Sequence, residues 1–192
     1  MCNEFQMLVP FDVVIETFNR TGGELVFPGG MPNVGPMASI RIGDRFPIVT
    51  LGGEGPQLAT TPWAWRSPQG PPGFNFRSDG RSFSNSLRCL IPADGFFEFT
   101  APEAGQKRKT KWRFTLAGQP FFWIAGVVKA GAFAMLTTEP GPDIAPYHDR
   151  QIVVLKPEEG AAWLHLLKPQ PDLLRALPAG SLDVEKVFPV PA

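Results

Sequence analysis

Cys2 stands directly behind the initiator Met1. If Met1 were removed, Cys2 would carry a free α-amine and a thiol on adjacent carbons, and this pair can capture an aldehyde as a five-membered thiazolidine ring. An unperturbed α-amine has a pKa of about 7.7–8.0, below that of lysine, so more of it is a neutral nucleophile at neutral pH. The small side chain at position 2 suits removal of Met1 by a methionine aminopeptidase. The alternative is that Cys2 belongs to an ordinary frayed terminus.

Two further residues are suited to proton transfer. Glu98 follows a turn in the aromatic run DGFFEF at residues 94–99. The period of two in a strand places Glu98 on the same face as Phe96, where an apolar wall would raise the pKa of the carboxyl group. His148 follows a proline-rich loop at a strand end, where reacting groups are commonly presented. The structural alternatives are an exposed strand glutamate and a surface histidine.

Asn75 and Arg77 are expected to share one face of the segment that follows the glycine- and proline-rich loop at residues 67–73. An amide and a guanidinium presented together can hold an oxygen-rich anion such as a sugar phosphate, or they can simply brace a loop. Trp63 and Trp65 precede this loop. Alternate tryptophans usually serve a core, although one ring beside Asn75 and Arg77 could stack on a nucleobase.

The composition narrows the class of protein. The 192 residues include 18 basic and 18 acidic side chains, so the chain is not a polycation that coats nucleic acid through charge alone, although a local basic groove is compatible with it. The basic tip at residues 107–109 is more typical of a solvated hairpin end than of a phosphate contact.

The cysteines and histidines indicate no metal site or disulfide framework. Cys2 and Cys89 are too few for either, and His148 and His165 lack metal-ligand spacing. No segment reads as a signal peptide or as the roughly 18 apolar residues of a membrane span. We therefore expect a cytoplasmic protein with neither a cofactor nor a membrane partner.

The pattern of apolar residues predicts an α+β fold in a single domain over residues 1–192. Closely spaced strand-like segments favour a mainly antiparallel, curved or barrel-like sheet with a few flanking helices. The expected strands cover residues 45–51, 89–91, 95–99, 111–116, 121–128, 133–138 and 151–155. The expected helices cover residues 12–19, 81–87, 157–167 and 171–177.

Several motifs occur together in an order typical of one family. The most specific is RCLIPADGFFE at residues 88–98. It is accompanied by Cys2, MPNVGP at 31–36, NFRSD at 75–79, FAMLTTE at 133–139 and HDR at 148–150. On these matches the chain resembles the SRAP family (SOS response-associated peptidase), whose members shield abasic sites in single-stranded DNA by covalent attachment. The resemblance covers residue 2 to about residue 155 and implies an SRAP-like fold.

The resemblance also implies a role for each candidate residue at the reacting centre. Cys2 would be the nucleophile and the point of DNA attachment, through both its amine and its thiol. Asn75 would position the linkage, and Glu98 would orient or protonate the reacting groups. His148 would be the acid/base that assists opening of the sugar ring.

For DNA binding, the resemblance implies that Arg77 holds backbone phosphate and that Trp63 lends an aromatic surface to the DNA groove. The partner would be single-stranded DNA containing an abasic site, bound by a monomer that is associated with the nucleoid when on DNA. The family usually begins Cys-Gly-Arg, whereas here Asn3 and Glu4 follow Cys2. A carboxylate at position 4 would repel a nearby phosphate.

Three functions stay open at this stage. The first is an abasic-site sensor that forms a thiazolidine crosslink to DNA, protects the lesion in the DNA damage (SOS) response and has an associated lyase or crosslink-reversal step. The second is a cysteine-type (auto)peptidase, a hydrolase, with Cys2 and His148 as nucleophile and base. The third is a non-catalytic DNA-binding member in which Asn3 and Glu4 have cost the covalent step. Arg77 favours the first, because it has no evident duty in a self-processing protease.

Overall fold

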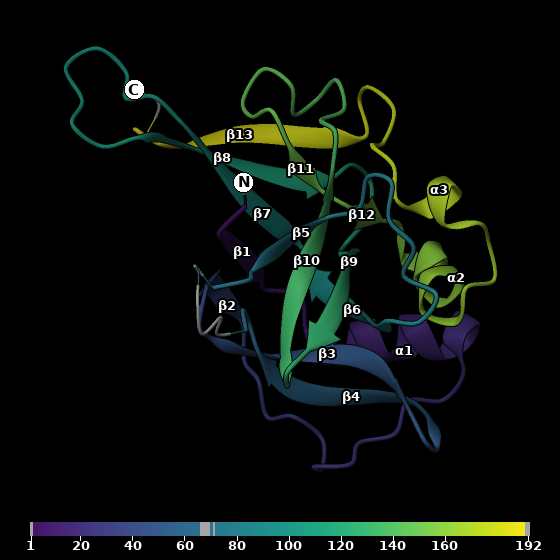
Figure 1. Ribbon diagram of the computed structural model, residues 1–192. Coiled ribbons are helices and arrows are strands. Elements are labelled where there is room, and N and C mark those ends of the chain that lie inside the picture. Colours follow the sequence, from purple (N-terminus) through teal and green to yellow (C-terminus); the bar gives the residue numbers. More distant parts are fainter. Residues whose placement is uncertain (1, 66–69, 71, 191–192) are drawn as a thin grey trace.

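Two mostly antiparallel sheets make up the body of the protein (Figure 1), in a computed structural model that describes residues 2–65, 70 and 72–190. The first sheet has the strand order β13-β8-β7-β1-β2. Its strands are β1 (Glu4–Met7), β2 (Met37–Arg41), β7 (Gly95–Thr100), β8 (Thr110–Leu116) and β13 (Leu182–Phe188). The N-terminal strand β1 is thus an interior strand, with β7 on one side and β2 on the other.

The second sheet has the order β11-β10-β9-β6-β3-β4, with β12 paired to β9 and β5 paired in parallel to β10. Its strands are β3 (Arg45–Gly52), β4 (Gly55–Pro62), β5 (Asn75–Arg77), β6 (Leu87–Ala93), β9 (Phe122–Lys129), β10 (Ala132–Thr138), β11 (Gln151–Ile152) and β12 (Val154–Leu155). The helices are α1 (Phe11–Gly22), the 3-10 helix η1 (Pro157–Glu159), α2 (Gly160–His165) and α3 (Gln170–Leu173). The expected α+β class is confirmed, and within the described residues neither sheet closes into a barrel.

The expected strands are all present, and α1, α2 and α3 overlap three of the expected helices. The helix expected over residues 81–87 is wrong: this stretch forms turns before β6 begins at Leu87. The Arg88 guanidinium donates hydrogen bonds to the carbonyl oxygens of Phe83, Ser84 and Ser86 at 2.8–3.3 Å. These carbonyl groups are therefore used outside a helix. Serine side chains also compete with helical hydrogen bonds, and Ser82 and Ser84 bond to each other here. Part of the loop expected over residues 67–73 falls outside the described residues.

An aromatic cluster joins β1 to the second sheet. Trp63 has no exposed surface and lies between Phe5 of β1, at a ring-centroid distance of 5.3 Å, and Phe133 of β10, at 6.1 Å. Phe5 also packs edge-on against Phe46 of β3 at 5.1 Å. Burying such large rings is the main driving force for holding the N-terminal strand in place.

Asp94, in the turn between β6 and β7, anchors the end of β1. Its carboxylate accepts hydrogen bonds from the Gln6 side chain at 2.8 Å and from the backbone N–H groups of Leu8 and Val9 at 2.5 and 2.8 Å. Its own backbone N–H donates to the Gln6 carbonyl at 3.1 Å. One side chain therefore satisfies both backbone donors that follow the strand.

We expect Asp94→Ala to lower the free energy of unfolding by about 1–3 kcal/mol, because it leaves three donors without their acceptor. Urea denaturation monitored by tryptophan fluorescence measures this change. Asp44→Ala is the matched control, since Asp44 is an exposed turn aspartate whose carboxylate accepts one hydrogen bond within the described part of the chain, from the Arg41 backbone N–H at 2.8 Å. Equal losses in the two variants would contradict the anchoring role of Asp94.

Candidate functional site

The candidate site forms where the residues preceding β1 meet β5 of the other sheet. The Asn75 side-chain amide donates a hydrogen bond to the Cys2 carbonyl at 2.8 Å. Asn75 Oδ1 is buried and has no hydrogen-bond partner among the described residues. A buried acceptor without a partner is costly, so its position beside Cys2 favours a role in receiving a substrate donor.

Cys2 itself is 1% exposed, and its thiol donates to the Glu4 carbonyl at 3.3 Å. Burial, and after it the nearby Glu98 carboxylate, raises the pKa of the Cys2 thiol well above its ordinary value. The sulfur is therefore held as a neutral thiol at physiological pH. Met1, whose removal would free the Cys2 amine, lies outside the described residues.

Glu98 approaches Cys2 from β7. The β1–β7 register pairs Phe5 with Phe96, so the chain before β1 runs alongside the second half of β7, where Glu98 lies. Glu98 is 1% exposed, and burial raises the pKa of its carboxyl group to about 7. Of the two alternatives, the buried strand glutamate is confirmed and the exposed one is wrong. A carboxyl group with this pKa can both donate and accept a proton near neutral pH.

His148 reaches the same place from the loop between β10 and β11. Together with Glu98, Asn3, Phe99 and Lys109 it lines a pocket of about 240 Å³. Its Nδ1 accepts the Arg150 backbone N–H at 3.0 Å, and Asp149 Oδ1, 2.8 Å from the same nitrogen, forms an ion pair only when the ring is protonated. Burial is the main cause that lowers the pKa of His148, which favours the neutral imidazole.

Arg150 holds this loop in place, a role that the sequence did not reveal. Its guanidinium is buried and bonds to Glu139 and Asp79, both at 2.5 Å, and to the Thr137 carbonyl at 3.0 Å. These bonds tie the residue two positions after His148 to β10 and to the segment that follows β5. The only sequence signal was the basic residue in the HDR motif.

The two residues expected to contact DNA lie in different environments: Arg77 is on the surface and Trp63 is in the core. Arg77 is exposed at the end of β5, in the three-residue strand that also carries Asn75. Trp63 is fully buried, and its indole N–H donates to the Phe74 carbonyl at 3.1 Å. The expectation that Trp63 provides an aromatic surface at the DNA groove is therefore corrected: its ring is occupied by the core contact with Phe5 and Phe133 described above.

A second pocket, of about 410 Å³, adjoins the first and shares Asn3 and Phe99 with it. Its other lining residues are Glu4, Arg41, Ile42, Arg108 and Lys111. Sequence reasoning missed this group of cations because they come from β2, β8 and the hairpin between β7 and β8. The only available signal was the basic tip at residues 107–109.

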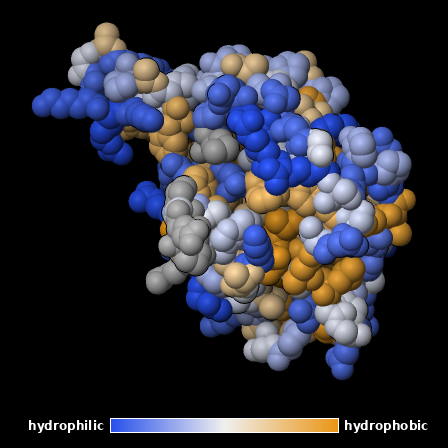
Figure 2. All heavy atoms as spheres, in the orientation of Figure 1, coloured by the Kyte–Doolittle hydropathy of each residue, from blue (hydrophilic) through white to orange (hydrophobic). Residues whose placement is uncertain are grey.

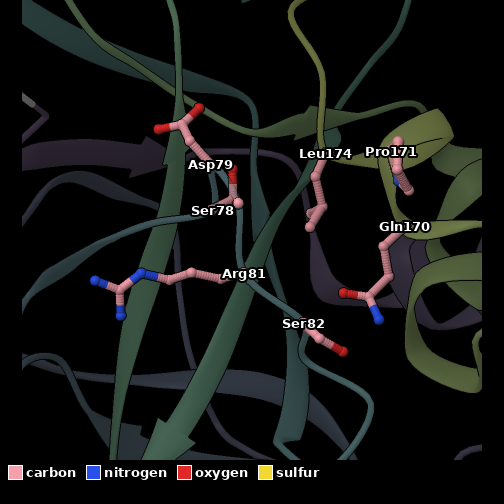
Figure 3. Close-up of a pocket in the computed structure, with 8 residues that line it drawn as sticks. Ser78, Asp79, Arg81, Ser82, Gln170, Pro171 and Leu174 are labelled. Carbon is pink, nitrogen blue, oxygen red and sulfur yellow. The ribbon is translucent and has the colours of Figure 1, made fainter.

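A larger pocket, of about 510 Å³, lies between the segment at residues 78–82 and α3 (Figure 3). None of Cys2, Asn75, Glu98 and His148 lines it. Its polar groups already serve the fold, since Gln170 accepts the Phe83 backbone N–H at 2.9 Å and Ser78 donates to the Thr137 carbonyl at 2.8 Å. Size alone does not make it the reactive site.

Among the described residues, no group of three or more His, Cys, Asp or Glu side chains could hold a metal ion. The helices of residues 2–65, 70 and 72–190 include none that is long and apolar enough to cross a membrane.

The two-sheet fold thus places Asn75 and Glu98 beside Cys2, and it brings His148 to the same pocket as Glu98 and Asn3. A family model described as SOS response associated peptidase (SRAP) matches residues 58–190, and the chain belongs to this family. The family assignment made from the motifs is thus confirmed.

Two relatives agree with this assignment, and a solved structure shows the same fold. The abasic site processing protein YoqW of Bacillus subtilis (strain 168) is 27% identical, over 92% of this chain and 86% of that protein. The abasic site processing protein YoaM of the same organism is 26% identical, over 92% and 85%. The crystal structure of a phage-related protein from Bordetella bronchiseptica matches the fold with a TM-score of 0.71 at 20% identity, over 97% of this chain and 94% of that one.

The raised pKa of Glu98 predicts a specific dependence of stability on pH. In the unfolded chain the carboxyl group ionises near its ordinary pKa of 4.5, but in the folded protein it ionises at about 7. Between these values the unfolded chain loses its proton first, so this group's contribution to stability falls as pH rises from about 4.5 to about 7. Glu98→Gln does not titrate. Relative to wild type, its free energy of unfolding should rise by up to about 3 kcal/mol between pH 5 and pH 8.

Urea denaturation at four pH values tests this, with Glu158→Gln as the control at an exposed glutamate. Parallel stability curves for Glu98→Gln and wild type would show that Glu98 does not ionise against a burial penalty.

Proposed function

We propose that this protein, after loss of Met1, attaches covalently to abasic sites in single-stranded DNA through Cys2 and thereby shields the lesion. The observation that carries the proposal is the grouping of three residues from different elements around the N-terminal segment: Asn75 and Glu98 lie beside Cys2, and His148 shares a pocket with Glu98 and Asn3. The names of the two relatives, both abasic site processing proteins, agree with it. Arg77, exposed on the same short strand as Asn75, supports contact with the DNA backbone.

The chemistry follows from the protonation states of the site. An abasic sugar is in equilibrium with a ring-opened aldehyde, and opening requires removal of a hydroxyl proton. The neutral form of His148, favoured by its lowered pKa, is suited to accept that proton. The Cys2 amine then adds to the aldehyde carbon and forms a carbinolamine.

Glu98 is suited to the next step, because a carboxyl group with a pKa of about 7 is partly protonated at neutral pH. It can donate a proton to the departing hydroxyl group, so that one water leaves and a Schiff base forms. The thiol sulfur then adds to the imine carbon, and its proton passes to the nitrogen, which closes the thiazolidine ring. The neutral state of the thiol fits this order, since the amine reacts first.

The raised pKa of the Cys2 thiol argues against the peptidase alternative. A cysteine peptidase uses a thiolate, which requires a lowered thiol pKa. Burial raises the pKa of Cys2 instead, with Glu98 adding to the rise. Whether a lyase or crosslink-reversal step accompanies attachment depends on the fate of the Schiff base.

Intact-mass analysis tests the proposal directly. The purified protein is incubated with a single-stranded oligonucleotide bearing one abasic site, and the expected product is protein without Met1 plus the oligonucleotide minus one water. Cys2→Ala should give no adduct, whereas Cys89→Ala, at the other buried cysteine, should give the full yield. Processed protein without an adduct would favour the peptidase or the non-catalytic DNA binder.

Asn75 provides a second test. Asn75→Ala removes both the 2.8 Å bond to the Cys2 carbonyl and the unused Oδ1 acceptor. The loss of one to two hydrogen bonds in the transition state should slow adduct formation by at least about tenfold. Single-turnover rates at saturating oligonucleotide measure the effect. Unchanged rates with unchanged stability would remove Asn75 from the reacting centre.

A further inference from the structure

The surface beside the candidate site carries a cluster of cations that the proposed chemistry does not use. Arg41, Arg108 and Lys111 line the 410 Å³ pocket, and Lys109 lines the adjoining pocket that contains Glu98 and His148. Asn3, next to Cys2, lines both. A polyanion bound at Cys2 would therefore pass directly over these cations.

Glu4 neutralises part of this cluster. Its carboxylate is 5% exposed and accepts bonds from Lys111 Nζ and Ser39 Oγ, both at 2.7 Å, with Arg41 NH2 at 3.7 Å. Burial alone would raise the pKa of Glu4, but the bonds from Lys111 and Ser39 and the charges of Lys111 and Arg41 outweigh it and lower the pKa. The carboxylate thus stays ionised where an external anion would otherwise bind.

The positive charges of Arg108 and Lys109 are not neutralised by a carboxylate of the described residues. Both side chains are exposed. The Arg108 guanidinium carbon lies over the Phe188 ring, 4.4 Å from its centroid, in a cation–π contact. Lys109 is close enough to His148 to add to the lowering of the pKa of that ring, which burial dominates.

Both residues belong to the hairpin that connects β7 to β8. Figure 1 shows this hairpin projecting from the body of the molecule near the C-terminal end of the chain, and in Figure 2 most of its surface is hydrophilic. A projecting basic arm next to a reactive centre has the form expected of a backbone contact for a nucleic acid.

We propose that Arg108 and Lys109 form an arm that binds the DNA phosphates flanking the sugar that reacts with Cys2, and that Glu4 weakens this binding by neutralising Lys111 and Arg41. This inference rests on the proposed function for its ligand. The ion pair with Lys111 explains how the chain accommodates a carboxylate at position 4, because Glu4 is neutralised within the protein. The arm then supplies the positive charge for the DNA.

The experiment measures non-covalent binding separately from adduct formation. Fluorescence anisotropy follows a labelled single-stranded oligonucleotide without an abasic site, over a range of salt concentrations. Arg108→Ala/Lys109→Ala should weaken binding and reduce the slope of log K against log[salt] by about 1.4, because each single-strand phosphate contact contributes about 0.7. The matched control is Lys156→Ala/Lys168→Ala, which removes two exposed cations outside both pockets and should leave the slope unchanged.

Glu4→Gln tests the second half of the inference. The glutamine can still accept the Ser39 bond, but it releases the charges of Lys111 and Arg41, so binding should tighten about three- to tenfold and the salt slope should steepen. Thermal unfolding of each variant verifies that the fold is intact. Equal slopes for the arm variant, the control and wild type would overturn the arm, and unchanged or weaker binding by Glu4→Gln would overturn the role of Glu4.

The abasic oligonucleotide then distinguishes this inference from the proposed function. A wild-type adduct combined with no effect of the arm variant on binding would reject the arm alone. Weaker binding by the arm variant combined with no adduct in wild type would reject the covalent function and leave the phosphate arm standing.

Discussion

The structure depends on the insertion of the N-terminal strand β1 between β7 and β2. A chain terminus is ordinarily the least ordered part of a domain. Here it is an interior strand, held by backbone pairing on both edges, by the burial of Phe5 against Trp63 and Phe46, and by the carboxylate of Asp94. A residue at position 2 thereby acquires a fixed place, and a reactive group there can be aligned with partners from other elements.

Burial of this site determines its electrostatics. Desolvation disfavours charge on every group, so it raises the pKa of the Cys2 thiol and of the Glu98 carboxyl group and lowers the pKa of His148. As a result the Cys2 thiol and the His148 ring favour their neutral forms, while Glu98 is divided between its protonated and ionised forms near pH 7. Such a site suits a condensation that proceeds by successive small proton transfers, and it suits a thiolate nucleophile poorly.

The site is also the meeting point of the two sheets. Glu98 belongs to the first sheet and Cys2 precedes its strand β1, whereas Asn75 belongs to the second sheet and His148 to a loop that Arg150 ties to the second sheet. The bond from Asn75 to the Cys2 carbonyl crosses between them. Displacement of one sheet relative to the other would separate Asn75 from Cys2, so the aromatic contacts of Trp63 help to position the candidate site as well as to stabilise the fold.

The sequence by itself determined the family and much of the fold. The aromatic and β-branched runs identified β3, β6 to β10 and the β11–β12 segment, because short runs of such residues are typical of strands. They did not identify β4 and β5, which lie in the same part of the chain. The pattern around Glu98 left a buried and an exposed carboxyl group open, and the structure shows that it is buried. Local reasoning failed at residues 81–87, where Arg88, a neighbour in sequence but fixed by β6, binds the carbonyl groups that a helix would need.

Tertiary structure decided the remaining features. Trp63 is a core residue because Phe5 and Phe133, 58 and 70 positions away in sequence, pack on its ring. The basic cluster next to Asn3 combines β2, β8 and the β7–β8 hairpin, and Glu4 is satisfied by Lys111, which is 107 positions away. Periodicity reports which face of one element a residue lies on, whereas these contacts depend on how the sheets pack together, and that is settled only by the burial of the whole chain.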